Sequence, residues 1–352
     1  MSKIRAGIIG TGGISNCHMM GYNAIPEVEV VACCDIDVEK VKKYAEKYSI
    51  PRWYADCREM MEKEQLDVVS VTTWTAAHKD CTIVALKGGA NVICEKPMAM
   101  NALEAEEMKR TAEENGKVLQ IGFVRRFGSD AAIFGEFRDA GVMGDIYYAK
   151  ATYLRRSGCP GGWFGNKVIS GGGPLIDLGV HVIDLSRYLA GNPKPVSAYG
   201  VTYSNLGKNR AKAPGDPAWE LSGEDKEIYN VEDFASAMVR FENGFTLSVE
   251  TSFNLNCKED VGNVQLFGTK GGATLSPRLE IYTDMAGRFV NIDTAAPVAF
   301  DFEGAFKAEI RGFVDAAMNG GCCRATAEDG LMLMKIIDGI YESARTGHEV
   351  IL

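Results

Sequence analysis

Short apolar runs alternate with helical patterns over the first third of the chain. The predicted strands are the runs at 4–10, 28–36, 66–73, 90–97 and 117–124. The segments between them place apolar residues at helical spacing, which predicts a helix after each of the first four strands. Strand–helix alternation at this pitch requires right-handed crossovers, so we expect a parallel sheet covered on both faces.

The pattern changes after about residue 124, where long segments rich in β-branched and aromatic residues follow one another. They include GDIYYAKATYLRRS, VSAYGVTYS, DFASAMVRFENGFTLSVETSFN, NVQLFGTKGGATL and RLEIYTD. The pair Asn243-Gly244 suits a hairpin turn between two such segments, which predicts an antiparallel sheet. The segment 207–227 is polar and rich in turn residues, and is predicted as a long loop, while the tail returns to helices.

These patterns predict two domains. We expect an α/β Rossmann domain with a parallel sheet over 1–123. It is followed by an α+β domain over 124–352, with a large, mostly antiparallel sheet and the C-terminal helices. A length of 352 residues fits two domains, because one hydrophobic core rarely serves a chain this long.

Composition narrows the class of partner. A net charge of −9 and the absence of a long basic run argue against binding to nucleic acid. No apolar run reaches the roughly 20 residues that a membrane span requires. The ten cysteines are scattered and form no CxxC pair, which predicts reduced, mostly buried thiols and a cytoplasmic protein.

The first predicted strand ends in a glycine loop, GTGGIS (10–15). Gly10 permits a tight turn and Gly12 lets the backbone approach a pyrophosphate, so the loop from Gly10 through Thr11, Gly12, Gly13 and Ile14 is a candidate dinucleotide site. Ser15 stands where a third glycine or alanine is usual, which weakens the match. Such a loop can also be an ordinary turn.

An acidic residue ends the second predicted strand. Asp35 has the spacing at which a carboxylate accepts the hydroxyls of an adenosine ribose, and it would repel a 2′-phosphate. No basic residue directly follows it, so we predict NAD rather than NADP. The alternative is that Asp35 caps the next helix, a role that Asp37 could fill instead.

Three later motifs complete a resemblance. ICEKPMA (93–99), GFVRRF (122–127) and SGGGPLIDLGVHVIDL (170–185) follow GTGGIS in this order. The chain resembles the Gfo/Idh/MocA family of sugar and cyclitol oxidoreductases over essentially its whole length. The resemblance implies that Lys96 lies between nicotinamide and substrate, that Asp177 and His181 reach the same pocket, and that Thr73, Trp74, His78 and Glu95 lie on the cofactor side.

The residues themselves agree with these roles. Asp177 and His181 are four residues apart and share one helix face, with Pro174 in the first turn and glycines before it that allow close approach to the cofactor. Histidine suits the base for a hydroxyl proton, Asp177 could orient it, and Lys96 could stabilise the alkoxide. The alternatives are a buried Asp–His contact with a surface lysine, or a metal site that also uses Asp184.

Further roles follow from the resemblance alone. Arg125, Tyr153, Arg156 and Trp163 lie on segments that face the substrate in the family, and dimers or tetramers are implied. We therefore expect an NAD-dependent dehydrogenase for a secondary ring hydroxyl of a sugar, glycoside or cyclitol. Two rivals stay open, which are an enzyme that recycles a tightly bound NAD and a sensor without turnover.

Overall fold

The computed structural model describes residues 3–207 and 228–352. It divides the chain into two compact units, Met1–Val124 with Phe302–Leu331, and Arg125–Asp301 with Met332–Leu352. The sequence pattern had placed all the C-terminal helices in the second domain, whereas Phe302–Leu331 belongs to the first unit. Apart from Gly207, the predicted loop 207–227 lies outside the described residues.

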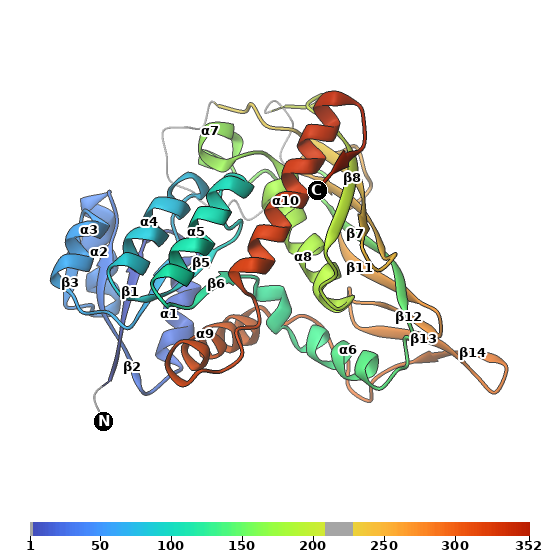
Figure 1. Cartoon of the computed structure of the whole chain (residues 1–352), viewed down its shortest axis with the longest axis horizontal. Helices are drawn as coiled ribbons and strands as arrows, with labels where there is room; N and C mark the ends of the chain where they lie inside the picture. Colours follow the sequence, from blue (N-terminus) through green and yellow to red (C-terminus); the bar gives the residue numbers. More distant parts are fainter. Residues whose placement is uncertain (1–2, 208–227) are drawn as a thin grey trace. The chain divides into compact units, whose positions relative to one another are not determined.

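The first unit has a parallel sheet in the order β3-β2-β1-β4-β5-β6, with helices on both faces (Figure 1). Its strands are β1 (Ile4–Ile9), β2 (Val28–Cys34), β3 (Arg52–Tyr54), β4 (Val68–Val71), β5 (Asn91–Glu95) and β6 (Leu119–Gly122). Its helices are α1 (Ser15–Asn23), α2 (Val38–Tyr48), α3 (Cys57–Lys63), α4 (Thr75–Lys87), α5 (Ala102–Glu114) and α9 (Phe302–Asn319). This strand order is that of a dinucleotide-binding Rossmann fold, so the predicted parallel sheet is confirmed.

Two short elements of this unit escaped the sequence pattern. β3 has three residues, of which two are exposed, so no apolar run marks it. α3 is only seven residues long and begins after Asp56, whose side chain accepts a hydrogen bond from the Arg58 amide. β3 is an edge strand of the sheet, and neither element disturbs the five strands that the apolar runs predicted.

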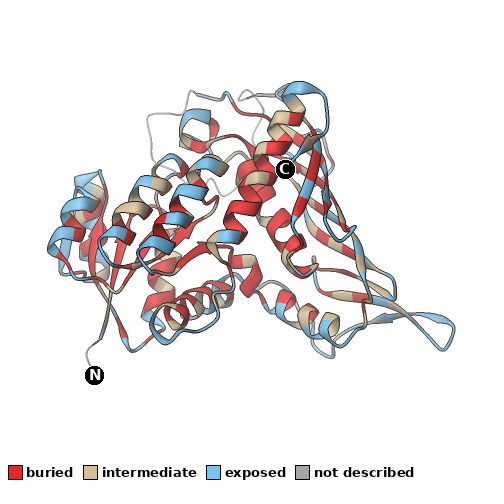
Figure 2. Ribbon diagram, viewed as in Figure 1, coloured by how far each residue is buried: buried red, intermediate tan, exposed pale blue. Residues whose placement is uncertain are grey.

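Helix α9 belongs to the core of the first unit although it begins 180 positions after the end of β6 in the sequence. Ile310, Phe313 and Val314 are buried with residues of β1, α1 and α2 in one cluster. Figure 2 marks the buried residues along the ribbon in red. α1 and α9 approach each other closely at Gly21, where an added Cβ would lie 2.5 Å from the Ile310 side chain. A glycine is therefore needed on α1 for α9 to pack.

The second unit has a mixed sheet in the order β14-β13-β12-β11-β7-β10-β9-β8-β15. Its strands are β7 (Ile146–Leu154), β8 (Pro195–Tyr203), β9 (Phe234–Phe241), β10 (Thr246–Ser252), β11 (Val261–Gly268), β12 (Gly271–Thr274), β13 (Glu280–Met285), β14 (Arg288–Ile292) and β15 (Val350–Ile351). β9 and β10 form the predicted Asn-Gly hairpin, with Gly244 at φ +85°. β7 and β10 pair in parallel, and the other pairings are antiparallel, which confirms a mostly antiparallel sheet.

The helical segments of this unit are η1 (Val124–Phe127), α6 (Ser129–Asp139), η2 (Gly162–Gly165), α7 (Lys167–Ser170), η3 (Leu175–Gly179) and α8 (Val180–Leu189). Helix α10 (Ala327–Thr346) begins in the first unit and continues in the second. η3 and α8 lie against the central strands β7 and β10. α10 approaches β8 at Gly200, where an added Cβ would lie 2.7 Å from Ile340.

One described segment, Lys167–Leu189, is long and apolar enough to meet a length-and-composition test for a membrane span, which the sequence pattern had not suggested. In the structure, 72% of its most apolar window is buried inside the folded unit. It also carries Asp177, His181 and the buried Arg187. These features are those of a core helix.

All ten cysteines are within the described residues, and all ten are free thiols. The prediction that most of them are buried was wrong, because only Cys33, Cys34 and Cys94 are fully buried. The others lie partly exposed or, at Cys322, exposed on the surface.

Candidate active site

The glycine loop joins β1 to α1 and leaves open space above its backbone. Gly10 has φ +90°, and an added Cβ there would lie 2.8 Å from the Thr72 carbonyl, so both conformation and packing require glycine. At Gly12 an added Cβ would meet no atom within 4 Å. Gly12 therefore keeps a space that no other part of the described chain fills, as a cradle for a phosphate group requires.

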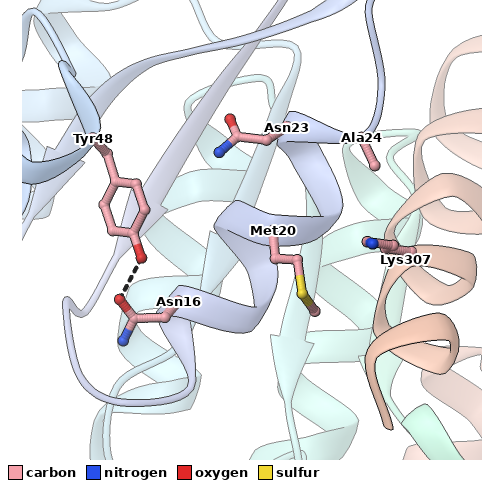
Figure 3. Close-up of a pocket in the computed structure, with 6 residues that line it drawn as sticks. All are labelled: Asn16, Met20, Asn23, Ala24, Tyr48 and Lys307. Carbon is pink, nitrogen blue, oxygen red and sulfur yellow. Dashed lines mark hydrogen bonds between the residues drawn. The ribbon is translucent and has the colours of Figure 1, made fainter. Parts of the chain in front are cut away.

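Ser15, the departure from the usual glycine pattern, closes this loop. It is fully buried, and its hydroxyl donates to the Gly12 carbonyl over 2.6 Å. Asn16 donates to the Gly13 carbonyl over 2.8 Å and accepts a hydrogen bond from the Tyr48 hydroxyl (Figure 3). The loop is thus held by side chains of its own helix, and Ser15 supports the loop.

A hollow of about 420 Å³ lies beside Asn16, on the outer side of α1 (Figure 3). It is lined by Asn16, Met20, Asn23, Ala24, Tyr48 and Lys307. None of the predicted site residues lines it, so it is separate from the candidate site at the strand ends.

Asp35, directly after β2, has a carboxylate that already accepts hydrogen bonds from the glycine loop. Its Oδ2 accepts hydrogen bonds from the Thr11 amide at 2.7 Å and the Thr11 hydroxyl at 2.9 Å. Burial would raise the pKa of Asp35, but the amides of Thr11 and Asp37, with the Lys40 charge, hold it below its ordinary value. Asp37 caps α2 by accepting from the Lys40 amide, so Asp35 is not needed as the cap.

Asp35 has a cation beside it that the residues directly after it in the sequence did not reveal. The Lys40 ammonium lies 3.2 Å from Asp35 Oδ2, although no basic residue directly follows Asp35 in the sequence. The first turn of α2 brings the cation back to the strand end. Asp35 Oδ1 accepts from the Asp37 amide at 3.1 Å and retains acceptor capacity for a ribose hydroxyl.

Lys96 follows β5 and is the one partly exposed residue in 92–99 of the described chain. Its neighbour Glu95 is buried, with Oε2 accepting from the Lys96 amide at 3.1 Å and Oε1 3.0 Å from His18 Nε2. The peptide between Lys96 and Pro97 is cis. Lys96 is therefore accessible at the end of β5, while the residues on both sides of it are buried.

The turn after β4 carries Thr73 and Trp74. Thr73 is partly exposed, and Trp74 is 38% exposed at the start of α4. His78, on the first turn of α4, is instead 1% exposed, with Nδ1 2.7 Å from the Pro97 carbonyl and Nε2 3.1 Å from the Thr73 carbonyl. His78 thus connects the turns after β4 and β5, and both of its ring nitrogens already have protein partners.

In the second unit, Asp177 and His181 interrupt a buried segment. From 172 to 187 they are the only partly exposed residues, and the others are buried. Asp177 lies in η3, a π-helical turn, which the sequence pattern did not reveal, and His181 lies in the first turn of α8. π-Helical turns inside helices occur often at functional sites.

The charge of Asp177 also acts on a nearby thiol. Burial raises the pKa of the Cys159 thiol to about 11, and the Asp177 charge adds to this effect.

Glu232 anchors the start of this helical segment. Its carboxylate accepts from the amides of Gly173 at 2.9 Å and Leu175 at 3.2 Å, and from the Tyr341 hydroxyl at 2.9 Å. Burial raises the pKa of Glu232 despite these hydrogen bonds. The carboxylate lies at the positive end of a helix dipole, where it satisfies amides that the helix leaves without partners.

The glycines before Pro174 are required by these contacts. An added Cβ would lie 2.0 Å from the Tyr341 hydroxyl at Gly172 and 2.4 Å from the Glu232 carbonyl at Gly173. The structure therefore gives these glycines a role in packing, and the close approach to a cofactor stays a prediction. They allow close packing within the second unit itself.

Asp184 belongs to a buried ion pair. Arg126, fully buried, donates from Nε and Nη2 to the two oxygens of Asp184 at 2.9 and 2.6 Å, and its guanidinium lies over the Tyr188 ring. A bidentate pair of this kind fixes the helix and occupies the carboxylate. It therefore counts against the metal alternative that used Asp184.

The predicted substrate residues each have neighbours in the second unit. Arg125 donates to Asp130 at 2.9 Å and lies over the Phe300 ring. Tyr153 packs against the buried cluster of Leu178, Val231 and Phe253. Arg156 is exposed, and its guanidinium donates to the Lys258 carbonyl. Trp163 is partly exposed and stacked on Phe164 at 3.9 Å between ring centres. These hydrogen-bond, ring and packing partners lie outside the predicted set, so the shared role of the four side chains in binding substrate stays a prediction.

Comparison with known proteins agrees with this geometry. Residues 4–123 match the family model described as "Oxidoreductase family, NAD-binding Rossmann fold", and 135–274 match the "GFO/IDH/MocA C-terminal domain". The chain belongs to the Gfo/Idh/MocA family. The resemblance inferred from the motifs is therefore confirmed, and the first unit is its NAD-binding domain.

Individual members of this family match over nearly the full length. D-glucoside 3-dehydrogenase of Escherichia coli (strain K12) is 35% identical, over 99% of this chain and 97% of that protein. The scyllo-inositol 2-dehydrogenase (NAD(+)) of Bacillus subtilis (strain 168) is 25% identical, over 99% and 96%. The structure of a levoglucosan dehydrogenase in complex with NADH and levoglucosan has a TM-score of 0.86 at 24% identity, with 99% of each chain covered.

The residues present fit the NAD of this family. The open space at Gly12 suits a pyrophosphate, and Asp35 Oδ1 suits a ribose hydroxyl. Two polar residues near the candidate positions escaped the sequence reasoning. His18, which the sequence patterns did not single out, bonds Glu95. Glu232 carried no signal beyond the acidic pair Glu232-Asp233 ahead of a strand.

Proposed function

We propose that this oxidoreductase oxidises a secondary ring hydroxyl of a glucoside to a ketone with NAD, and that the hydroxyl is the one at C3. The identity of 35% with a D-glucoside 3-dehydrogenase over 99% of the chain supports this substrate class. The observation that carries the mechanism is that Lys96, Asp177 and His181 are the partly exposed residues of otherwise buried segments.

Each side chain has a separate part in the proposed reaction. When bound, NAD supplies the hydride acceptor. His181 takes the hydroxyl proton as general base, because an imidazole titrates near neutral pH. Lys96 stabilises the negative charge that develops on the oxygen, and Asp177 orients His181 or holds a neighbouring hydroxyl. Arg125, Tyr153 and Trp163 are proposed as contacts to the remaining hydroxyls and the ring face.

The substrate proposal is tested by a panel of sugars. Purified protein with NAD is offered methyl D-glucosides, free aldoses and inositols, and NADH formation is followed by absorbance. We expect turnover of the glucosides, with no turnover of the 3-deoxy glucoside and retained turnover of the 2-deoxy one. Turnover of an inositol alone would move the substrate to the cyclitols and overturn the C3 assignment.

The same preparation addresses the form in which NAD is held. Absorbance of the purified protein, before any cofactor is added, shows whether nicotinamide is retained. If it is retained and turnover then requires a second sugar as oxidant, the cofactor is recycled on the enzyme. We expect turnover with added NAD and one sugar. Localisation in the cytoplasm is proposed on the same grounds as before, since the ten free thiols suit a reducing compartment.

We also propose that a second copy of this chain covers the open face of the mixed sheet. Tyr199 and Met238 are directly opposed across β8 and β9 and are nearly half exposed, and Phe267 on β11 lies 5.7 Å from the Tyr148 ring. Apolar side chains on the solvent side of a sheet indicate an interface. Light scattering should show a dimer or tetramer, and the double variant Tyr199→Glu with Met238→Glu should give a smaller species.

A further inference from the structure

Lys96 lies between two buried residues that are each bonded to a different buried histidine. Glu95 on its N-terminal side meets His18 of α1, and Pro97 on its C-terminal side meets His78 of α4. Both histidines are almost fully inaccessible, at 0% and 1% exposure. All of these groups belong to the first unit.

His18 lies in a chain of hydrogen-bond contacts that leads from Tyr22 through Ser70 to Glu95. The Tyr22 hydroxyl is 2.8 Å from Ser70 Oγ, which is 2.9 Å from His18 Nδ1, while Nε2 is 3.0 Å from Glu95 Oε1. If Tyr22 donates to Ser70 and Ser70 to Nδ1, then Nε2 carries the proton and donates to Glu95. Burial raises the pKa of Tyr22 well above its ordinary value, so its hydroxyl keeps the proton that starts the chain.

Glu95 connects His18 to the backbone of Lys96. Its Oε2 accepts from the Lys96 amide at 3.1 Å, while its Oε1 is held by His18. Gly122 of β6 permits the arrangement, because an added Cβ there would lie 3.1 Å from Oε1. The position of the Glu95 carboxylate is therefore fixed, and the buried His18 is the group that fixes it.

His78 fixes the other side of Lys96. Its Nδ1 lies 2.7 Å from the Pro97 carbonyl and its Nε2 lies 3.1 Å from the Thr73 carbonyl. A neutral imidazole carries one N–H, and we assign it to Nδ1, which has the shorter contact, so that Nδ1 donates to Pro97 and Nε2 faces Thr73 without a proton. Proline has no amide hydrogen, so its carbonyl is the one polar backbone group by which this residue can be held. The histidine thereby ties Pro97 to the first turn of α4.

We propose that His18 and His78 are positioning residues that hold the backbone on both sides of Lys96 and so fix its ammonium for the reaction. This inference rests on the proposed function, in which Lys96 stabilises the developing alkoxide. A loosely held ammonium would spend less time in the productive position, and small displacements of a catalytic group can lower turnover by about 100-fold.

The two histidines use different nitrogens toward the Lys96 segment, which gives a sharp test. A glutamine amide nitrogen reaches the position of Nε2, and an asparagine amide nitrogen reaches that of Nδ1. At position 18, His18→Gln keeps the donor to Glu95 and His18→Asn loses it. At position 78 the order reverses, since His78→Asn keeps the donor to Pro97 and His78→Gln loses it.

The experiment compares these four variants of the full-length protein. We measure kcat and KM for the glucoside found active, NAD affinity, thermal unfolding, and amide hydrogen exchange of the peptide that contains Lys96. We expect His18→Gln and His78→Asn to stay within a few-fold of the parent. His18→Asn and His78→Gln should lose about 10- to 100-fold in kcat with little change in KM, and should exchange the Lys96 amide faster.

A role in packing alone predicts a different outcome. The same substitution, Gln or Asn, would then give the higher kcat at both positions, and kcat would follow the thermal stability of the variants. This result would overturn the inference. Lys96→Met tests the proposed function separately. If Lys96→Met kept full turnover, the role of Lys96 would be wrong, and the reversed order in amide exchange would still decide whether the histidines fix the segment.

Discussion

The two units hold their candidate functional residues by different means. In the first unit these residues lie at the ends of β2, β4 and β5, and buried polar groups fix them through hydrogen bonds, as at Asp35 and Glu95. In the second unit Asp177 and His181 lie on a helical segment whose other residues from 172 to 187 are buried. A single carboxylate, Glu232, anchors the start of that segment.

The difference follows from what each backbone already provides. A turn after a parallel strand has no repeating hydrogen-bond pattern, so its side chains must be fixed individually. A helix satisfies its own backbone beyond the first turn and needs only packing and an anchor at its start. We therefore expect the first unit to be sensitive to the exchange of single hydrogen-bond donors, and the second to loss of the anchor or of a reactive group.

The largest expected effect is the loss of His181 from the second unit. His181→Ala should lower hydride transfer by the roughly 10²–10⁴-fold typical of a lost general base. NAD affinity should stay near that of the parent, because NAD binds to the first unit. Single-turnover kinetics and cofactor titration measure the two quantities. His348→Ala, at an exposed histidine of the same unit, is the matched control, and near-parental transfer in His181→Ala would show that His181 is not the base.

Removal of the anchor comes next. Glu232→Ala leaves the amides of Gly173 and Leu175 and the Tyr341 hydroxyl without their acceptor. We expect a loss of about 3 kcal/mol in the free energy of unfolding, since each buried donor left without a partner costs about 1–3 kcal/mol. Urea denaturation measures it, with the exposed Glu242→Ala as control. A loss no larger than that of the control would mean that packing alone holds the helix.

Cofactor preference depends on a single carboxylate and its cation. The parent should bind NAD more tightly than NADP, and Asp35→Ser should weaken NAD binding by about tenfold, the equivalent of one hydrogen bond. The Lys40 ammonium, 3.2 Å from Asp35 in the parent, would then be free to meet a 2′-phosphate. Fluorescence titration should show improved NADP binding in Asp35→Ser, and Lys40→Ala in that background should remove the gain. Equal binding of both cofactors by the parent would contradict the role of Asp35.

The smallest effect concerns acid and the buried His78. Burial lowers the pKa of His78 below its ordinary 6.5, and outweighs the carbonyls of Pro97 and Thr73, which favour the protonated form. Since the unfolded chain binds the proton more readily, the stability that neutral His78 contributes is complete above about pH 6.5 and is lost as the pH falls through the lower, folded pKa. Denaturation at about pH 7.5 and about pH 5.5 should show a smaller loss for His78→Asn than for the parent. Parallel losses would assign the acid sensitivity to other groups.

Local patterns predicted most of the framework. Apolar runs marked five strands of the first sheet, Asn243-Gly244 marked the β9–β10 hairpin, and the glycine loop, Asp35 and Lys96 stand at strand ends as expected. The three-residue β3 was missed because it is mostly exposed and carries no pattern. The sequence thus predicts elements well where burial imposes a period.

Contacts between distant residues could not be predicted in this way. His18 and Glu95 are 77 positions apart, and Gly173 and Glu232 are 59 apart, so no local spacing reveals either pair. The π-helical turn at Asp177 also lacks a sequence signature, since almost all residues from 172 to 187 are buried and no alternation of buried and exposed positions records the shift that the turn introduces. The parts of the site that support the reactive residues are therefore the parts that required the structure.

The return of the chain to the first unit has a consequence for synthesis. Ile310, Phe313 and Val314 of α9 complete a core whose other members lie before residue 94, and Gly21 is shaped to receive Ile310. A growing chain on the ribosome therefore cannot finish its nucleotide-binding unit until nearly all of the second unit has emerged. A gene fragment that stops at Val124 would leave the α9-facing side of α1 exposed, so the minimal piece that folds includes residues 302–331 as well.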